Sequence, residues 1–406
     1  MSVELNIDFD KPVDRTSTYS LKWDEAGDAM PMWVADMDFP TAPAVRQALQ
    51  RRLDHGVFGY SVVPDEWAQA YAGWWRRRHG LEIEEDWLIF ATGVVPAISS
   101  MVRKLTTPAE NVVIMTPVFN IFFNSILNNG RNVLESPLAY TRDDKQGLAS
   151  YDVDWADLTA KLADPQTSLM ILCNPANPAG RIWDKATLAR IAELAWEHHV
   201  TVISDEIHCD LTDPGVSYVP FASVSDHALM NSVTCLAPTK TFNMAGMQTA
   251  AVFAADPTLR HKVWRGLNTD EVAEPNAFAM TATIAALNEG EPWLEELRTY
   301  LAGNKRLIRT MIDDYNASPA TVASGSRVAL SECQATYLPW LDCSTITHDT
   351  DRFCDWLARK KKVMFSPGAE FGGNGRTFLR INAATQRAKL EEAMKRLISG
   401  LNEYQD

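Results

Sequence analysis

From about residue 86 the chain alternates short runs of apolar and β-branched residues with longer segments of helical periodicity. This alternation is typical of a mostly parallel sheet covered by helices. The segments between the runs include helix-like stretches at 95–105 and 185–199. We therefore predict an α/β fold, with strands at 87–91, 111–115, 168–173, 200–204, 232–237 and 250–255.

Polar or small residues follow most of the predicted strands. Ligands of open α/β sheets lie beyond the carboxyl ends of the strands, so these residues are the first candidates for a site. Together they supply a glycine turn into a helix, an aromatic ring, an amide, a carboxylate and one amine. The segments are TGVV (92–95), TPVFN (116–120), NPANPAG (174–180), SDEIH (204–208) and APTK (237–240).

Each of these residues has an ordinary structural interpretation when it is taken alone. Gly93 fits a turn before a helix, and Phe119 fits the core. Asn177 fits a turn, Asp205 a helix cap, and Lys240 a solvated surface cation. One ligand, however, needs all five groups. Pyridoxal phosphate condenses with a lysine amine, pairs its ring nitrogen with a carboxylate, and places its phosphate at a helix N-terminus.

The pattern changes after about residue 285. Residues 291–315 predict a long helix, shorter strand-like pieces follow, and a final helix begins near Gln386. We therefore expect a large cofactor-binding domain over 46–285 and a smaller α+β domain over 286–406. Residues 1–45 have weak periodicity, and we expect them to form an arm over one of the domains and part of the small domain.

Charge and composition exclude several classes of function. The net charge of −14 argues against nucleic-acid binding, which needs clustered cations. The N-terminus lacks an export-signal pattern, and no run approaches the roughly 20 apolar residues that span a bilayer. The six cysteines are scattered without a Cys-x-x-Cys pair, so we expect buried thiols and no metal site. These features favour a cytoplasmic protein that acts on a small molecule and binds neither nucleic acid nor membrane.

The motifs and their order resemble a known family. They are similar to fold-type I pyridoxal-phosphate enzymes of the class I/II aminotransferase superfamily, and within it to the cystathionine β-lyase-like C-S lyases. The resemblance covers nearly the whole chain, and it implies a seven-stranded sheet and a homodimer with active sites at the subunit interface. The matching segments are MPMWVADMDFP (30–40), HGVFGY (55–60), ATGVVPAIS (91–99), TPVF (116–119), CNPANPAG (173–180), SDEIHCDL (204–211), APTKTFNMAG (237–246) and FLRIN (378–382).

The resemblance also implies a role for each site residue. Lys240 would form the Schiff base and then move the Cα proton, and Asp205 would pair with the pyridine nitrogen. Without the resemblance, Arg380 reads as a strand-surface residue, Tyr60 as a core or interface residue, and His208 as a hydrogen-bonded structural residue. The remaining implied roles are Asn177 on the cofactor O3′ and the substrate, His208 near the same oxygen, Phe119 stacked on the ring, Gly93 and Val94 on the phosphate, Arg380 on the substrate α-carboxylate, Ala35 on the substrate, and Tyr60 reaching the site from the other subunit.

The reaction implied is C-S β-elimination from S-substituted L-cysteines such as L-cystathionine. Two alternatives stay open: an aminotransferase of class I/II, and a regulatory protein that contacts a transcription factor. Many transaminases of this class carry an arginine eight positions after the lysine, whereas this chain has Gln248, which fits the lyase branch. Phe119 stands where the family usually has tyrosine, and Ala176 stands where it has histidine, so both bear on substrate preference or rate.

Overall fold

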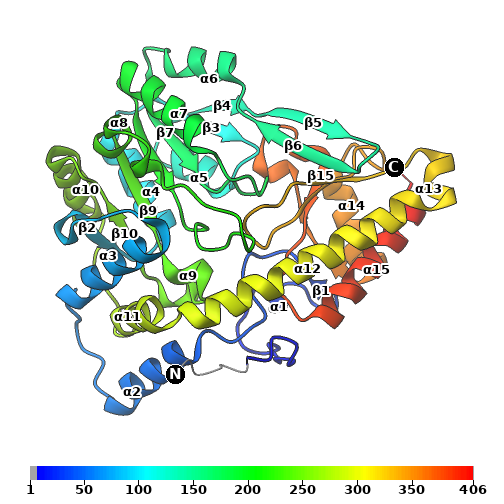
Figure 1. The fold of residues 1–406 in the computed structure, drawn as a ribbon, viewed down its shortest axis with the longest axis horizontal. Coiled ribbons are helices and arrows are strands. Elements are labelled where there is room, and N and C mark those ends of the chain that lie inside the picture. The colour runs from blue at the N-terminus through cyan, green and yellow to red at the C-terminus, as the bar shows by residue number, and fades with distance from the viewer. Residues whose placement is uncertain (1–6, 406) are drawn as a thin grey trace.

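A seven-stranded sheet forms the centre of the large domain in the computed structural model, which describes residues 7–405 (Figure 1). The strand order is β2-β10-β9-β8-β7-β3-β4. Only β10 runs antiparallel to its neighbours, so the predicted mostly parallel seven-stranded sheet is confirmed. The strands are β2 (Leu88–Ala91), β3 (Asn111–Thr116), β4 (Asn132–Pro137), β7 (Thr167–Cys173), β8 (Thr201–Asp205), β9 (Ser232–Leu236) and β10 (Ala250–Phe253).

Helices cover both faces of this sheet. Neighbouring side chains of β8 point to opposite faces of the sheet. Val202 is buried in the hydrophobic cluster on one face, and Ile203 is buried in the cluster on the other. This burial on both faces explains why the central strands read as continuous apolar runs. One face carries α4 (Val94–Leu105), α5 (Ile121–Leu127) and α10 (Pro257–Thr269), and the other carries α6 (Trp155–Leu162), α7 (Lys185–Glu197) and α8 (Asp226–Met230).

A second sheet of six strands forms the small domain. Its order is β14-β15-β12-β11-β6-β5, and only β11 and β6 pair in parallel. Two of its strands come from residues 139–152, within the span that the sequence suggests for the large domain. The strands are β5 (Ala139–Asp143), β6 (Leu148–Asp152), β11 (Ala329–Ser331), β12 (Trp340–Asp342), β14 (Ser366–Pro367) and β15 (Phe378–Arg380).

The long helix α12 (Glu291–Ala317) links the two domains. Figure 1 shows it running from α11 beside the large domain to α13 at the far end of the small domain. No helix within residues 7–405 is both long and apolar enough to cross a membrane. The other α-helices are α1 (Leu21–Asp24), α2 (Pro43–His55), α3 (Asp65–His79), α9 (Pro238–Thr241), α11 (Ala279–Glu289), α13 (Pro319–Ser324), α14 (Thr350–Trp356) and α15 (Arg387–Glu403).

The N-terminal arm contacts both domains rather than one. Strand β1 (Met30–Pro31) pairs with β13 (Val363–Met364) in the small domain, whereas Phe39 is buried in a cluster of the large domain. The fully buried Lys22 ammonium lies 3.2 Å from a carboxylate oxygen of Asp38. A buried ion pair of this kind holds the chain in one position because separation would leave an uncompensated charge. Residues 1–6 of the predicted arm lie outside the described residues.

Candidate active site

A cavity of about 240 Å³ lies at the carboxyl ends of the large-domain strands. It gathers side chains or backbone from segments that are far apart in the sequence, as expected at this edge of an α/β sheet. Eight of the candidate residues line it: Ala35, Gly93, Val94, Phe119, Asn177, Asp205, His208 and Lys240. Arg380 reaches the cavity wall through Asn177, with its Nη1 3.3 Å from the Asn177 Oδ1.

Lys240 stands on α9, the single helical turn that follows β9. Pro238 begins this turn, and its fixed φ angle suits a first helical position. The Lys240 Nζ donates a hydrogen bond of 2.6 Å to the carbonyl oxygen of Ala35 in the arm. Burial and the nearby Arg380 charge lower the pKa of Lys240 to about 8, although Asp36 and Asp205 act in the opposite direction. A fraction of this amine is therefore uncharged at neutral pH and able to accept a proton.

Asp205 is the last residue of β8 and is buried at the base of the cavity. Its Oδ1 accepts a hydrogen bond from the Ile207 backbone N–H at 3.2 Å. Burial raises the pKa of Asp205 to about 7, and the adjacent Glu206 charge acts in the same direction. A cation placed against this carboxylate would therefore be strongly favoured, because it would compensate a charge that the protein buries at a cost.

Two buried nitrogen groups near the cavity have unused hydrogen-bonding capacity. The Nδ1 of His208 and the Nε of Arg380 have no partner within residues 7–405. Burial, together with the Lys240 and Arg380 charges, lowers the pKa of His208 to about 3, so this ring is neutral. Burial also lowers the pKa of Arg380 to about 10. Unpaired groups of this kind are costly, and they indicate that an anionic or hydrogen-bonding ligand completes the site.

The start of α4 supplies backbone amides to another wall of the cavity. Gly93 precedes the helix, and Val94 and Val95 begin it, with no side-chain cap on these first amides. The free N–H groups and the helix dipole favour a phosphate at this position. Phe119 follows β3 and lines the cavity.

Three residues that hold the arm at the site are not among the candidates that the sequence predicts. The Tyr337 hydroxyl donates to the same Ala35 carbonyl as Lys240, at 2.9 Å, and Asn382 donates to the carbonyls of Val34 and Asp36. Trp33, which the sequence leaves outside the set, accepts a bond of 3.4 Å from Arg380 through its carbonyl oxygen. These contacts fix the backbone of the arm, and backbone acceptors carry no residue signature.

Tyr60 is the candidate that lies away from the cavity and makes no contact with its lining. It stands fully exposed in the segment between α2 and α3. Its neighbours Val57, Phe58 and Val62 are exposed as well, so the segment 57–62 forms an exposed run of apolar and aromatic side chains. Within one chain Tyr60 therefore contributes nothing to the pocket.

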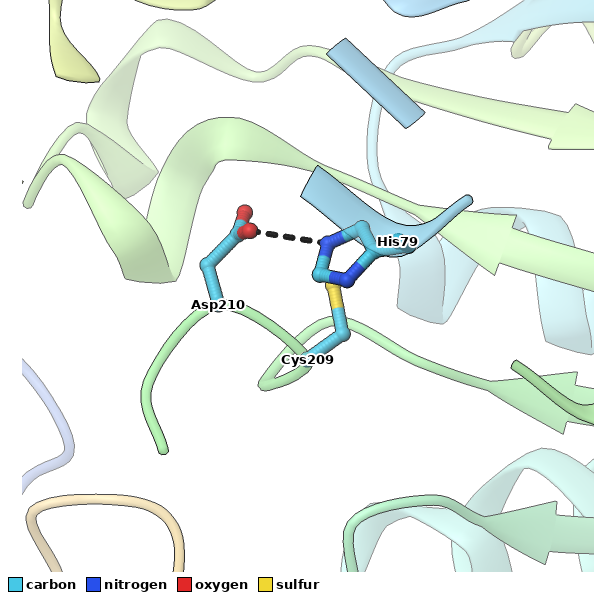
Figure 2. Close-up of side chains that lie close together, drawn as sticks. All are labelled: His79, Cys209 and Asp210. Carbon is cyan, nitrogen blue, oxygen red and sulfur yellow. Dashed lines mark hydrogen bonds and ion pairs between the residues drawn. The ribbon is translucent and has the colours of Figure 1, made fainter. Parts of the chain in front are cut away.

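A cluster behind the active site ties α3 to the turn that carries Lys240. Figure 2 shows His79, Cys209 and Asp210, with the His79 Nε2 3.0 Å from Asp210. Asp210 also accepts hydrogen bonds from Trp74, from Arg78 and from Thr241, the residue after Lys240. The Asp210 carboxylate thus accepts from Arg78 and His79 together, and the cluster forms a buried ion-pair network.

The cavity has the groups that pyridoxal 5′-phosphate requires. It offers an amine with a lowered pKa, a buried carboxylate, an aromatic face and free helix amides, and it contains a histidine nitrogen in need of a partner. This fold and this cavity define a fold-type I pyridoxal-phosphate protein. A family model described as aminotransferase class I and II matches residues 28–397. The chain belongs to this family.

Similar proteins cover nearly the whole chain. Cystathionine beta-lyase PatB of Bacillus subtilis is 40% identical over 403 residues, which are 98% of this chain and all of PatB. Cystalysin of Treponema denticola, whose crystal structure contains pyridoxal 5′-phosphate, has a TM-score of 0.89 at 29% identity and covers 97% of this chain and 98% of its own. The pyridoxal-phosphate-bound C-S lyase of Staphylococcus hominis has a TM-score of 0.87 at 28% identity, with 98% and 99% covered.

Proposed function

We propose that the protein is a pyridoxal-phosphate-dependent C-S β-lyase that cleaves S-substituted L-cysteines such as L-cystathionine. The overall reaction consumes one water and yields a thiol, pyruvate and ammonia. The observation that carries the proposal is the placement of the Lys240 amine in one cavity with Asp205 and beside Arg380. The names of full-length relatives, among them a cystathionine beta-lyase and a C-S lyase, support the elimination branch.

The residues of the cavity divide the work between binding and proton transfer. Arg380 binds the substrate α-carboxylate, because its buried guanidinium has an unpaired Nε and only long contacts to Asn177 and Trp33. When bound, pyridoxal 5′-phosphate supplies an electron-withdrawing ring that stabilises negative charge at the substrate Cα. Lys240 removes the Cα proton, and its lowered pKa suits this work near neutral pH. The thiolate then leaves from Cβ.

The remaining residues position the cofactor next to the Lys240 amine. Asp205 would keep the ring nitrogen of the cofactor protonated, and Asn177 and neutral His208 would offer polar groups to its ring oxygen. Phe119 would pack against the cofactor ring, and the Gly93 and Val94 amides would bind its phosphate. The Ala35 carbonyl accepts from the Lys240 amine whenever that amine is free.

We further propose a cytoplasmic homodimer in which Tyr60 acts in the site of the partner chain. The exposed run around Tyr60 supports this proposal, because apolar side chains gathered on a surface mark interaction sites. In the proposed dimer each Tyr60 enters the cavity of the partner chain, because it does not line the cavity of its own chain. The large domain then spans 46–285 apart from the β5–β6 segment, and the small domain spans 286–406.

A substrate panel tests the proposed reaction. The holoprotein is offered S-substituted L-cysteines without any keto acid, and pyruvate and thiol are measured for each. We expect both products in equal amounts, and the Lys240→Ala variant should release neither. Borohydride reduction followed by digestion should place the cofactor label on the peptide that contains Lys240. Label on another peptide would contradict the assignment of this lysine.

An aminotransferase is the second candidate, because the matching family model is described by that activity and the first proton transfer needs the same residues. It predicts a keto acid derived from the amino-acid substrate, formed only when a keto-acid acceptor is present. Pyruvate without an acceptor would decide for the lyase.

A further inference from the structure

A carboxylate that has no role in the proposed mechanism stands beside the substrate-binding groups. Glu370 lies in the short 3-10 helix Ala369–Phe371, which the small domain places against the segment after β3. The Asn120 side-chain amide donates to the Glu370 Oε2 at 2.7 Å, and the Val118 N–H donates to the Phe371 carbonyl at 2.8 Å. Glu370 is therefore held next to Phe119, which lines the cavity.

The same short helix also contacts the arginine that we assign to the substrate α-carboxylate. The ring of Phe371 lies 4.7 Å from the Cζ of Arg380. Arg380 is only 6% exposed, and its Nε has no partner within residues 7–405, so the arginine points to an anionic ligand on grounds independent of Glu370. The α-carboxylate on Arg380 would thus fix the end of the substrate from which its side chain starts, close to Glu370.

Glu370 keeps an accessible acceptor. Its side chain is exposed, and its Oε1 has no hydrogen-bond partner within residues 7–405. Partial burial raises the pKa of Glu370, and the charge of Arg380 opposes this effect. Asp351, in the first turn of α14, lies near enough to add negative potential. A cation near this edge of the site would meet one free carboxylate oxygen and a second acidic group.

We propose that Glu370 determines substrate preference by binding a cationic group, an ammonium above all, on the S-substituent of the cysteine substrate. The proposal rests on the proposed C-S lyase function. A positive group two methylenes beyond the sulfur would pair with Glu370 while Arg380 holds the α-carboxylate. The site then recognises the substrate through two charges, the cation of Arg380 at the α-carboxylate and the anion of Glu370 at the S-substituent.

Two substrates of nearly equal shape test this preference. S-(2-aminoethyl)-L-cysteine carries an ammonium where S-propyl-L-cysteine carries a methyl group. The readout is the ratio of kcat/KM for the first to kcat/KM for the second. We expect Glu370→Gln to lower this ratio about three- to tenfold, the range for a partly exposed charge pair. We also expect the wild-type ratio to fall as the salt concentration rises. Glu197→Gln, at the exposed end of α7, is the matched control and should leave the ratio unchanged.

A charge reversal and a binding measurement complete the test. Glu370→Lys should turn the preference toward S-(2-carboxyethyl)-L-cysteine. L-Lysine and L-2-aminoheptanoate have no leaving group, so their dissociation constants report binding alone, and Glu370→Gln should weaken only that of L-lysine. An unchanged ratio in both variants, or an equal change for all substrates through Arg380, would overturn the proposal. Absence of thiol release from every S-substituted cysteine would instead overturn the proposed function.

Discussion

The Lys240 amine shows how two neighbouring charges set the chemistry of one residue. Its pKa is lowered to about 8 by burial and by Arg380. Replacement of Arg380 by Gln removes the positive neighbour, so we expect the pKa of Lys240 in the cofactor-free protein to rise. The rate of acetylation of Lys240, followed by mass spectrometry across pH, should therefore reach its midpoint at higher pH in the variant. Arg327→Gln, at a half-buried position in the small domain outside the cavity lining, serves as the control. An identical midpoint in wild type and the Arg380 variant would exclude this coupling.

The buried carboxyl of Asp205 makes the stability of the folded protein depend on pH. Burial raises its pKa to about 7 from an ordinary value of 3.8, so the folded cofactor-free protein favours the protonated carboxyl. The stability linked to this group is present in full below the unfolded pKa and is lost as the pH rises through about 7. Asp205→Asn mimics the protonated form, so we expect the variant to be the more stable protein at pH 8, by at most roughly 4 kcal/mol.

Urea unfolding of the cofactor-free proteins at pH 5 and pH 8 measures this difference. The stability difference between Asp205→Asn and wild type should be smaller at pH 5. The variant with bound cofactor should lose lyase activity, because the cofactor's ring nitrogen then has no carboxylate partner. A variant that is less stable than wild type at pH 8 would show that burial of the Asp205 carboxylate does not destabilise the folded protein.

At the scale of elements, the loop that carries Asn177 depends on one close approach. Gly180 has a φ of +70°, and a Cβ at this position would lie 2.9 Å from the Cα of Cys333. Gly130 has nearly the same φ, +71°, but no atom within 4 Å of its would-be Cβ. Gly130→Ala should therefore cost only the backbone strain of about 1 kcal/mol, whereas Gly180→Ala should cost that and a displacement of the loop.

The two glycine variants separate strain from contact. We expect Gly180→Ala to lose about 2 kcal/mol more stability than Gly130→Ala in urea unfolding, and to bind pyridoxal 5′-phosphate more weakly because Asn177 moves. Equal losses of stability in the two variants would mean that the segment at Cys333 moves aside without a further loss of folding free energy.

The strands and their carboxyl ends are the part of the fold that the sequence predicts best. Residues 111–116 are buried along their whole length, so their apolar run marks a central strand. Strand β5, by contrast, alternates exposed and half-buried residues, and its sheet partners lie partly in residues 329–380, a pairing that local periodicity does not contain. The arm could not be predicted from periodicity either. It is held by ion pairs such as Lys22–Asp38 and by backbone acceptors such as the Ala35 carbonyl, and not by a periodic apolar face.

At the scale of the whole molecule, the exposed run around Tyr60 is the feature that one chain leaves unexplained. Val57, Phe58 and Val62 are exposed beside it, and their burial between two subunits would release water from apolar surface. A homodimer with this interface is isologous, so each subunit would give its Tyr60 to the partner's cavity and receive one in return.

Hybrid dimers test this exchange directly. The Lys240→Ala and Tyr60→Ala chains, carried on different affinity tags, are co-expressed and the mixed dimers are isolated. If Tyr60 acts across the interface, one cavity of each mixed dimer has both intact residues and the other has neither, so we expect about half of the wild-type activity per dimer. The Lys240→Ala homodimer should be inactive, and the Tyr60→Ala homodimer strongly impaired. If Tyr60 acted within its own chain, each cavity of the mixed dimer would lack one residue, and its activity would not exceed the mean of the two parents.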